Sequence, residues 1–153
     1  MKPDLIIAPG NRVKATIDKL NAIAPTIAFD PYSGDNAKNQ YGEMEQTFKT
    51  IADVLGKQAE ADKVLADVQK SYDDAKAKLA SAGKAGTEYV LTQAFSNQNA
   101  AVLRLFLDNA MAVEVLNRIG LKNAYKSEKF EGNGFATGSV ESLPAVQGAN
   151  FIY

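Results

Sequence analysis

Two short apolar runs, separated by a helical pattern, open the chain. Leu5–Ala8 lies between Pro-containing segments, and Thr26–Phe29 is rich in β-forming residues. Short continuous runs of this kind are typical of buried parallel strands. Between them, four apolar side chains recur at helical spacing: Val13, Ile17, Leu20 and Ile23. A strand, one helix and a second strand form a βαβ unit, so the sequence predicts two parallel strands joined by a right-handed crossover.

The middle of the chain carries the longest helical pattern. Residues 30–40 are polar and contain Pro, Gly, Asn and Asp, which predicts a surface connection. An apolar helical face then continues to Leu55 and stops at Gly56. A narrow apolar stripe follows at spacings of three and four: Ala61, Leu65, Val68, Tyr72, Ala75 and Leu79. Because Lys, Asp and Glu surround this stripe, it predicts an amphipathic helix that packs on a core.

The last part of the chain has a second α/β pattern. Residues 89–92 and 102–106 read as strands, with residues 96–99 as a loop between them. An apolar helical face ends at Gly120, and a glycine-rich loop runs from Glu131 to Gly138. Ser139 can cap a short helix, and a final strand is expected at the end of the chain. The elements predict an α/β block, a long helix and a second α/β block.

Composition excludes several functions. The 153 residues include no Cys and no His, so this chain offers no thiol nucleophile, disulfide, His general base or Cys or His metal ligand. With 17 Lys and Arg against 18 Asp and Glu, the net charge of −1 gives no bulk attraction for nucleic acid or an anionic membrane. The glycines form neither a dinucleotide fingerprint nor a phosphate-binding P-loop. An enzyme on a doubly wound sheet is therefore weakly supported, and an interaction module built on the long helix stays open as another alternative.

Six segments occur in an order and at spacings that resemble a known family. They are Lys2–Ala8, Ile23–Thr26, Ile51–Gly56, Val102–Phe106 with Asn109, Leu116 with Ile119–Ala124, and Ser139–Leu143. Together they resemble the periplasmic binding proteins of iron-siderophore importers, a group that also includes vitamin B12 and haem binders. The resemblance extends over essentially the whole chain.

The resemblance implies an α/β fold with two Rossmann-like lobes of parallel strands, joined by a long helix. Residues 1–42 would belong to the first lobe, 43–82 to the connecting helix and 83–153 to the second lobe. Each lobe would be incomplete, so the chain is expected to be a central fragment whose exposed sheet edges favour self-association.

The implied function is that of an extracytoplasmic solute-binding protein, periplasmic or lipid-anchored, and not of an enzyme. It would capture a ferric siderophore, of catecholate, hydroxamate or citrate type, in the cleft between the lobes. It would then deliver this ligand to the permease of an ABC importer. No intrinsic cofactor is expected.

Two arginines are the main candidates for ligand binding, because a guanidinium donates a planar fork of hydrogen bonds to chelate oxygens. Arg12 follows the first strand, and ligands of parallel sheets bind beyond the carboxyl ends of strands. Arg104 lies within an apolar strand, where alternation places it on the face opposite Leu103 and Leu105. The alternatives are a solvated loop residue for Arg12 and a solvent-facing residue of an edge strand for Arg104.

Five further residues are weaker candidates. Phe95, Ser96, Asn97 and Phe135 are expected in loops that line the cleft, although a loop aromatic is often part of a local core. Glu141, in the first turn of the helix after Ser139, matches the family's acidic residue that meets an Arg of the permease. Its alternative role is to favour the helix dipole. Arg118, near the end of a helix, is expected to be a surface residue that suits the dipole.

Overall fold

The computed structural model describes residues 2–153, and the predicted βαβ unit is present at its start. β1 (Ile6–Pro9) and β2 (Thr26–Phe29) pair in parallel, with Ile7 opposite Ile27. The single helix expected between them is wrong, because two short helices occur instead, α1 (Gly10–Val13) and α2 (Ile17–Asn21).

Thr16 explains the break between these two helices. Its backbone N–H and its hydroxyl both donate to the carbonyl oxygen of Val13, at 2.8 and 3.2 Å. A hydroxyl that bonds its own backbone in this way competes with helix continuation. The four apolar residues therefore lie on two helices rather than on one continuous face.

The connection after β2 is less exposed than its polar composition predicts. It contains a short 3-10 helix, η1 (Asn36–Lys38), and leads into α3 (Gln40–Val54). Ala37 and Gln40 are buried, with 1% and 7% of their surface exposed. The prediction of a surface connection is therefore wrong for the end of this segment, because residues from the last part of the chain cover it.

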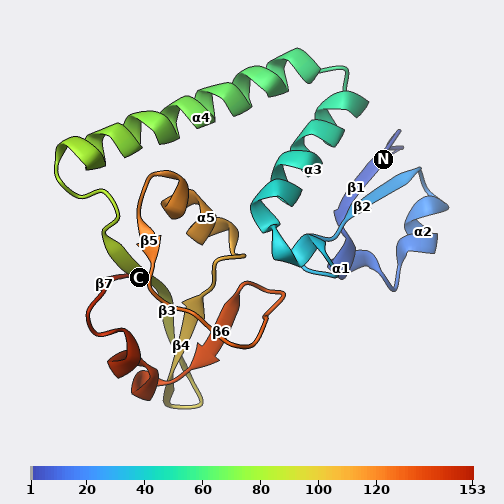
Figure 1. Ribbon diagram of the computed structural model, residues 1–153. Helices are drawn as coiled ribbons and strands as arrows, with labels where there is room; N and C mark the ends of the chain where they lie inside the picture. Colours follow the sequence, from blue (N-terminus) through green and yellow to red (C-terminus); the bar gives the residue numbers. More distant parts are fainter. Residues whose placement is uncertain (1) are drawn as a thin grey trace.

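The long helical region consists of two helices that meet at an angle, α3 and α4 (Gln58–Ser81) (Figure 1). The predicted interruption at Gly56 is confirmed. Gly56 has φ +65°, and the N–H groups of Gly56 and Lys57 donate to Asp53 and Ala52. This is a Schellman motif, which ends a helix through a left-handed residue that glycine adopts without a Cβ clash. The predicted stripe of α4 is its less exposed side.

The second sheet is mixed, which corrects the expectation of parallel strands in both lobes. Its strand order is β5-β3-β4-β6, with β7 also paired to β3. These strands are β3 (Glu88–Asn97), β4 (Ala100–Phe106), β5 (Lys122–Asn123), β6 (Phe135–Gly138) and β7 (Asn150–Ile152). β4 is antiparallel to β3 and β6, whereas β5 and β7 are parallel to β3.

A tight hairpin turn is the reason for the antiparallel pair. Gln98 and Asn99 both have positive φ, 48° and 65°, and they join β3 directly to β4. Two such residues form the kind of turn whose twist matches that of paired strands. A two-residue connection cannot cross over to a parallel strand, so the polar residues that predicted a loop instead form the end of a hairpin.

Two small cores cover opposite faces of the second sheet. On one face, Tyr89 packs with Val113 of α5 (Met111–Arg118). On the other, Val90 and Leu105 pack with Val146 of the 3-10 helix η2 (Val140–Val146). The alternation of neighbouring strand residues between the two cores follows the period of a strand. The sheet is thus covered at one end, while the hairpin end carries exposed side chains.

Candidate functional site

Arg104 lies on the open part of the second sheet, on the face predicted by strand alternation. Its neighbours Leu103 and Leu105 point to the opposite face and are buried, with 7% and 1% of their surface exposed. β4 is an interior strand, flanked by β3 and β6, so the alternative of an edge-strand residue is wrong. Arg104 therefore has a neighbouring strand on each side, with Gln93 and Thr137 directly opposite.

Two aromatic rings hold the guanidinium of Arg104. Its Cζ lies 5.0 Å from the ring centre of Phe95 and 4.6 Å from that of Phe135. Nη1 also donates a hydrogen bond of 3.0 Å to Oε1 of Gln93. Cation–π contacts at such distances favour a fixed position for the charge. We call Arg104, Phe95, Phe135 and Gln93 the Arg104 cluster.

The Arg104 cluster is a cationic and aromatic surface whose charge is available to a ligand. Among the ion pairs formed within residues 2–153, none includes Arg104. A guanidinium has five N–H donors, and Gln93 accepts from one nitrogen. The remaining donors can serve oxygen atoms of a bound group, and the rings supply apolar contact beside them.

The structure corrects the expected loop positions of the weaker candidates. Phe95, Ser96 and Asn97 belong to β3, and Phe135 begins β6. Phe95 and Phe135 join Arg104, which the sequence did not predict as a group. Ser96 pairs with Ala101 near the hairpin turn, and alternation directs it to the face opposite Phe95. Asn97 lies next to the turn itself.

Arg12 occupies a different part of the molecule. It is exposed on α1, directly beyond the carboxyl end of β1, as the sequence predicts. It is the third of the four residues of this single-turn helix, so it is solvated but does not lie in a loop. Arg12 thus belongs to the first sheet and the Arg104 cluster to the second.

Arg118 has a larger role than surface stabilisation. Its Nε donates a 3.0 Å hydrogen bond to Oε1 of Glu114, and its Cζ lies 4.1 Å from the ring centre of Tyr41. Tyr41 is on α3 and almost fully buried, and its hydroxyl donates to that of Tyr72 on α4. Burial and this hydrogen bond raise the pKa of Tyr41 to about 12. Arg118 therefore connects α5 with the helices that precede the second sheet.

An apolar hollow of about 510 Å³ lies beside the first sheet. Residues of β1, β2, α3 and the start of α5 line it, among them Ile7, Phe29, Met44, Phe48, Ile51 and Met111. The sequence did not predict this hollow, because its lining comes from four separate segments. Their apolar character was visible, but their convergence depends on the tertiary fold.

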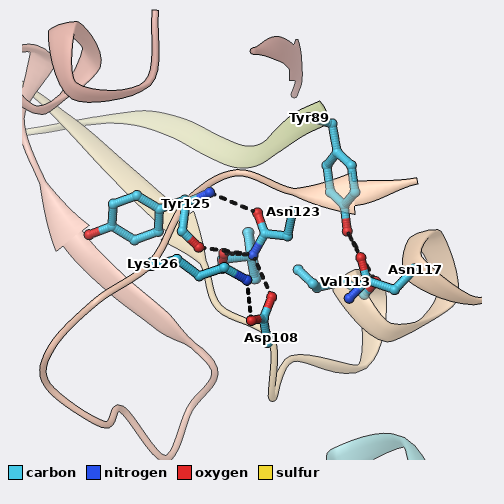
Figure 2. Close-up of polar contacts among 8 residues, drawn as sticks. Tyr89, Asp108, Val113, Asn117, Asn123, Tyr125 and Lys126 are labelled. Atoms are coloured by element: carbon cyan, nitrogen blue, oxygen red, sulfur yellow. Dashed lines mark hydrogen bonds and ion pairs between the residues drawn. The ribbon is translucent and has the colours of Figure 1, made fainter. Parts of the chain in front are cut away.

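A polar network centred on the buried Asn123 fixes the loop that follows β4. Asn123 Nδ2 lies within hydrogen-bonding distance of Phe106 O, Asp108 Oδ1 and Tyr125 O, at 3.1, 3.1 and 3.2 Å (Figure 2). Asp108 also pairs with Lys126. A buried amide needs such partners, because an unpaired polar group in the interior costs about 1–3 kcal/mol. In the sequence Asn123 was one residue of the segment Ile119–Ala124 that matches the family, but its partners were not predictable.

Figure 2 also shows Tyr89, whose hydroxyl is anchored on α5. It lies 3.1 Å from both the Val113 carbonyl oxygen and Oδ1 of Asn117. Burial raises the pKa of Tyr89 well above its usual range. The neutral phenol therefore joins β3 to α5.

Glu141 lies in the first turn of η2 and is exposed. The hydroxyl of Ser139 donates a hydrogen bond to Oε2 of Glu141. This bond, together with the backbone N–H of Glu141, lowers the pKa of the carboxyl group. The side chain is therefore an ionised, surface-directed carboxylate at neutral pH.

Within residues 2–153, no group of three or more acidic side chains is arranged to hold a metal ion. No helix in the same part of the chain has the length and apolar character needed to cross a membrane.

Comparison with solved structures shows that the chain has the mixed α/β fold of siderophore binding proteins. The Fe3+-Desferal-bound siderophore binding protein FhuD from Vibrio cholerae has a TM-score of 0.86 and 26% identity, with 99% of this chain and 55% of that chain covered. SirA from Staphylococcus aureus has a TM-score of 0.68 and 26% identity, with 94% and 49% covered.

The family follows from the sequence match. The model of the family described as "Periplasmic binding protein" matches residues 1–149, so the chain belongs to the periplasmic binding protein family. This agrees with the prediction that the chain is not an enzyme, because the family is non-catalytic.

Curated relatives are substantially longer than this chain. The Fe(3+)-citrate-binding protein YfmC of Bacillus subtilis (strain 168) is 30% identical over 146 residues, which are 95% of this chain and 42% of the relative. The iron(3+)-hydroxamate-binding protein YxeB of the same organism is 29% identical over 145 residues, or 94% and 40%. The chain therefore spans less than half the length of these relatives.

Proposed function

We propose that the intact binding protein that includes this chain captures a ferric siderophore or a related iron chelate between two lobes. It then delivers this ligand to an ABC importer. The names of the relatives support this proposal, since they bind ferric citrate, a ferric hydroxamate and a ferric siderophore. The observation that carries it is the guanidinium of Arg104, held between two aromatic rings with no carboxylate partner in residues 2–153.

The chemistry of such ligands suits the Arg104 cluster. Catecholate and citrate complexes of Fe(III) carry negative charge, and hydroxamate complexes present oxygens that accept hydrogen bonds. Arg104 can donate to either, and a hydrogen bond to a charged group contributes about 1.5–3 kcal/mol. Phe95 and Phe135 would contact the apolar parts of the ligand. Iron would arrive as part of the ligand, so the protein needs no cofactor of its own.

Arg12 is proposed as a second contact from the first lobe, with Asn97 as a secondary contact at the hairpin. Ser96 faces away from the Arg104 cluster, so it is not proposed as a contact. The proposed lobe boundaries are residues 1–42 and 83–153, with 43–82 as the connection. Arg12 and the Arg104 cluster then come from different lobes, which is the arrangement that a cleft between lobes requires.

Glu141 is proposed as a docking residue for the permease of the importer. An exposed carboxylate with a lowered pKa remains charged at neutral pH and can pair with an arginine of the partner. This role requires that the intact protein works outside the cytoplasm, as a periplasmic or lipid-anchored protein.

Binding measurements on the intact protein test the proposal. Ferric citrate, a ferric hydroxamate and a ferric catecholate are titrated separately, with calorimetry and tyrosine fluorescence as readouts. We expect Arg104→Ala to weaken binding of the preferred chelate roughly tenfold or more, because it removes a charge-assisted hydrogen bond. Arg104→Lys keeps the charge but loses the planar fork of donors, so its affinity should lie between those of the unaltered protein and Arg104→Ala.

Lys84→Ala provides the control, since Lys84 is an exposed cation in the turn before β3 and should not affect binding. The proposal fails if the unaltered intact protein binds none of the three chelates.

A further inference from the structure

Gln40 and Asn109 connect the first part of the chain with the last. Gln40, at the start of α3, donates from Nε2 to the carbonyl oxygen of Gly132 at 2.9 Å. Asn109, between β4 and α5, donates from Nδ2 to the carbonyl oxygens of Ala37 and Glu131, at 2.8 and 3.0 Å. Most of these bonds join residues more than 70 positions apart in the sequence. We call these two side chains and their backbone partners the Gln40–Asn109 junction.

The junction also completes the N-terminus of α5. The N-cap residue of this helix is Ala110, whose side chain cannot accept a hydrogen bond. Oε1 of Gln40 instead accepts from the backbone N–H of Met111, at 3.4 Å. The first N–H groups of a helix need partners from outside the helix. A side chain of α3 therefore caps a helix that supports the second sheet.

The chain packs closely around this contact. Gly134 has φ +80°, and a Cβ there would lie 2.9 Å from Ala110 Cα and 3.0 Å from Nε2 of Gln40. A Cβ at Gly132 would lie 3.1 Å from the carbonyl oxygen of Tyr32. Backbone from both parts of the molecule thus meets at close range. Only glycine fits at Gly134 beside Gln40, whereas a Cβ at Gly132 needs a shift of a few tenths of an ångström.

We propose that Gln40 and Asn109 are positioning residues that fix the angle between the first and the second sheet. The proposal rests on the proposed function in one respect: Arg12 and the Arg104 cluster would then be held at a separation set by the junction. Neither Gln40 nor Asn109 needs to touch the ligand. Their effect on affinity comes from the fraction of molecules in which the two sheets are correctly oriented.

The size of the effect follows from that fraction. The apparent dissociation constant equals the intrinsic constant divided by the fraction of the binding-competent form. Gln40→Ala leaves the carbonyl of Gly132 and the N–H of Met111 without their side-chain partner. Asn109→Ala leaves the carbonyl groups of Ala37 and Glu131 without theirs. If each change lowers the competent fraction to about a tenth, affinity falls about tenfold.

Distance measurements test the positioning role without any ligand. Spin labels are attached at Lys19→Cys on α2 and Gln147→Cys after η2, two exposed positions in a chain that has no other cysteine. We expect Gln40→Ala and Asn109→Ala to broaden the distribution of distances between the labels. Gln46→Ala is the matched control, an exposed glutamine on the same helix, and should leave the distribution unchanged. Unchanged distributions in both junction variants would overturn the proposal.

A disulfide across the junction separates positioning from other effects. A Cβ at Gly132 would lie 3.6 Å from Cβ of Ala37, within the range of about 3.5–4.5 Å that disulfides need. Ala37→Cys with Gly132→Cys is introduced into Gln40→Ala in the intact protein, and ferric chelate binding is measured before and after reduction. We expect the oxidised form to recover most of the lost affinity and the reduced form to lose it again.

The two proposals have distinguishable failures. Equal affinities in the oxidised and reduced forms, both below that of the unaltered protein, would show that Gln40 acts other than by orientation. If the unaltered intact protein binds no chelate, the proposed function fails, and the distance measurement still decides the positioning role. Gln40→Glu keeps the acceptor for Met111 but loses the donor to Gly132, so its distribution should be intermediate.

Discussion

The two sheets differ in how well they are supported. The second sheet has a core on each face, with Val90, Leu105 and Val113 at 1% exposure or less. In the first sheet the side chain of Ile7 is 42% exposed and faces an open apolar hollow. The Arg104 cluster therefore lies on a scaffold that supports itself. Arg12 follows the first sheet, which has less core of its own and depends more on contacts with the rest of the molecule. The Gln40–Asn109 junction supplies contacts of this kind.

The largest expected effect comes from removing a core side chain of the second sheet. Leu105→Ala should lower the free energy of unfolding by about 2–5 kcal/mol, because it deletes buried methyl groups and leaves a cavity. Ile7→Ala should cost less than about 1 kcal/mol, since its side chain is already largely in water. Urea unfolding of the chain measures both. Equal losses would mean that the two sheets are supported to the same degree.

The difference between the sheets also shows what the sequence could predict. The first sheet and the interruption at Gly56 followed from local signals, namely apolar runs, spacing and a glycine. The hairpin of the second sheet did not, because Ser96 and Asn97 resemble loop residues and only the left-handed Gln98 and Asn99 form the turn. Strand alternation predicted the face of Arg104. It could not predict Phe95 and Phe135 as partners, because that depends on the register of three strands.

The Gln40–Asn109 junction is the feature that the sequence predicted least. Gln40 was part of a polar segment and Asn109 one residue of a family motif, and both carry amide side chains of the kind that loops contain. What gives them a role is the backbone that meets them, and that backbone is distant in sequence. Long-range hydrogen bonds to carbonyl groups leave no pattern in the chain, since every residue has a carbonyl.

High pH should weaken the contact between the two regions, because Tyr41 lies where α3, α4 and α5 meet. Burial raises the pKa of Tyr41 from 10.0 to about 12, so the folded state favours the neutral phenol. The contribution of Tyr41 to the free energy of unfolding is then fully present below pH 10. It falls by about 2 kcal/mol as the pH rises towards 12. Urea unfolding at several pH values measures this loss.

Tyr41→Phe provides the control for this pH dependence. It removes the titrating hydroxyl and keeps the ring that Arg118 covers, so the loss between pH 10 and 12 should become smaller by about 2 kcal/mol. Tyr89, whose pKa burial also raises, keeps its own contribution to the loss. An identical pH dependence in both proteins would mean that other groups, such as the remaining tyrosines and the lysines, account for the loss of stability.

A small effect on stability, similar to that of Ile7→Ala, is expected at the residue next to Leu105. Arg104→Ala removes two cation–π contacts on the partly exposed face, and should change the free energy of unfolding by about 1 kcal/mol or less. The same urea titration measures it beside Leu105→Ala. A loss as large as that of Leu105→Ala would make Arg104 part of the core. A small loss, together with weakened chelate binding in the intact protein, would assign the effect of Arg104 to ligand recognition, because the sheet beneath it would be unchanged.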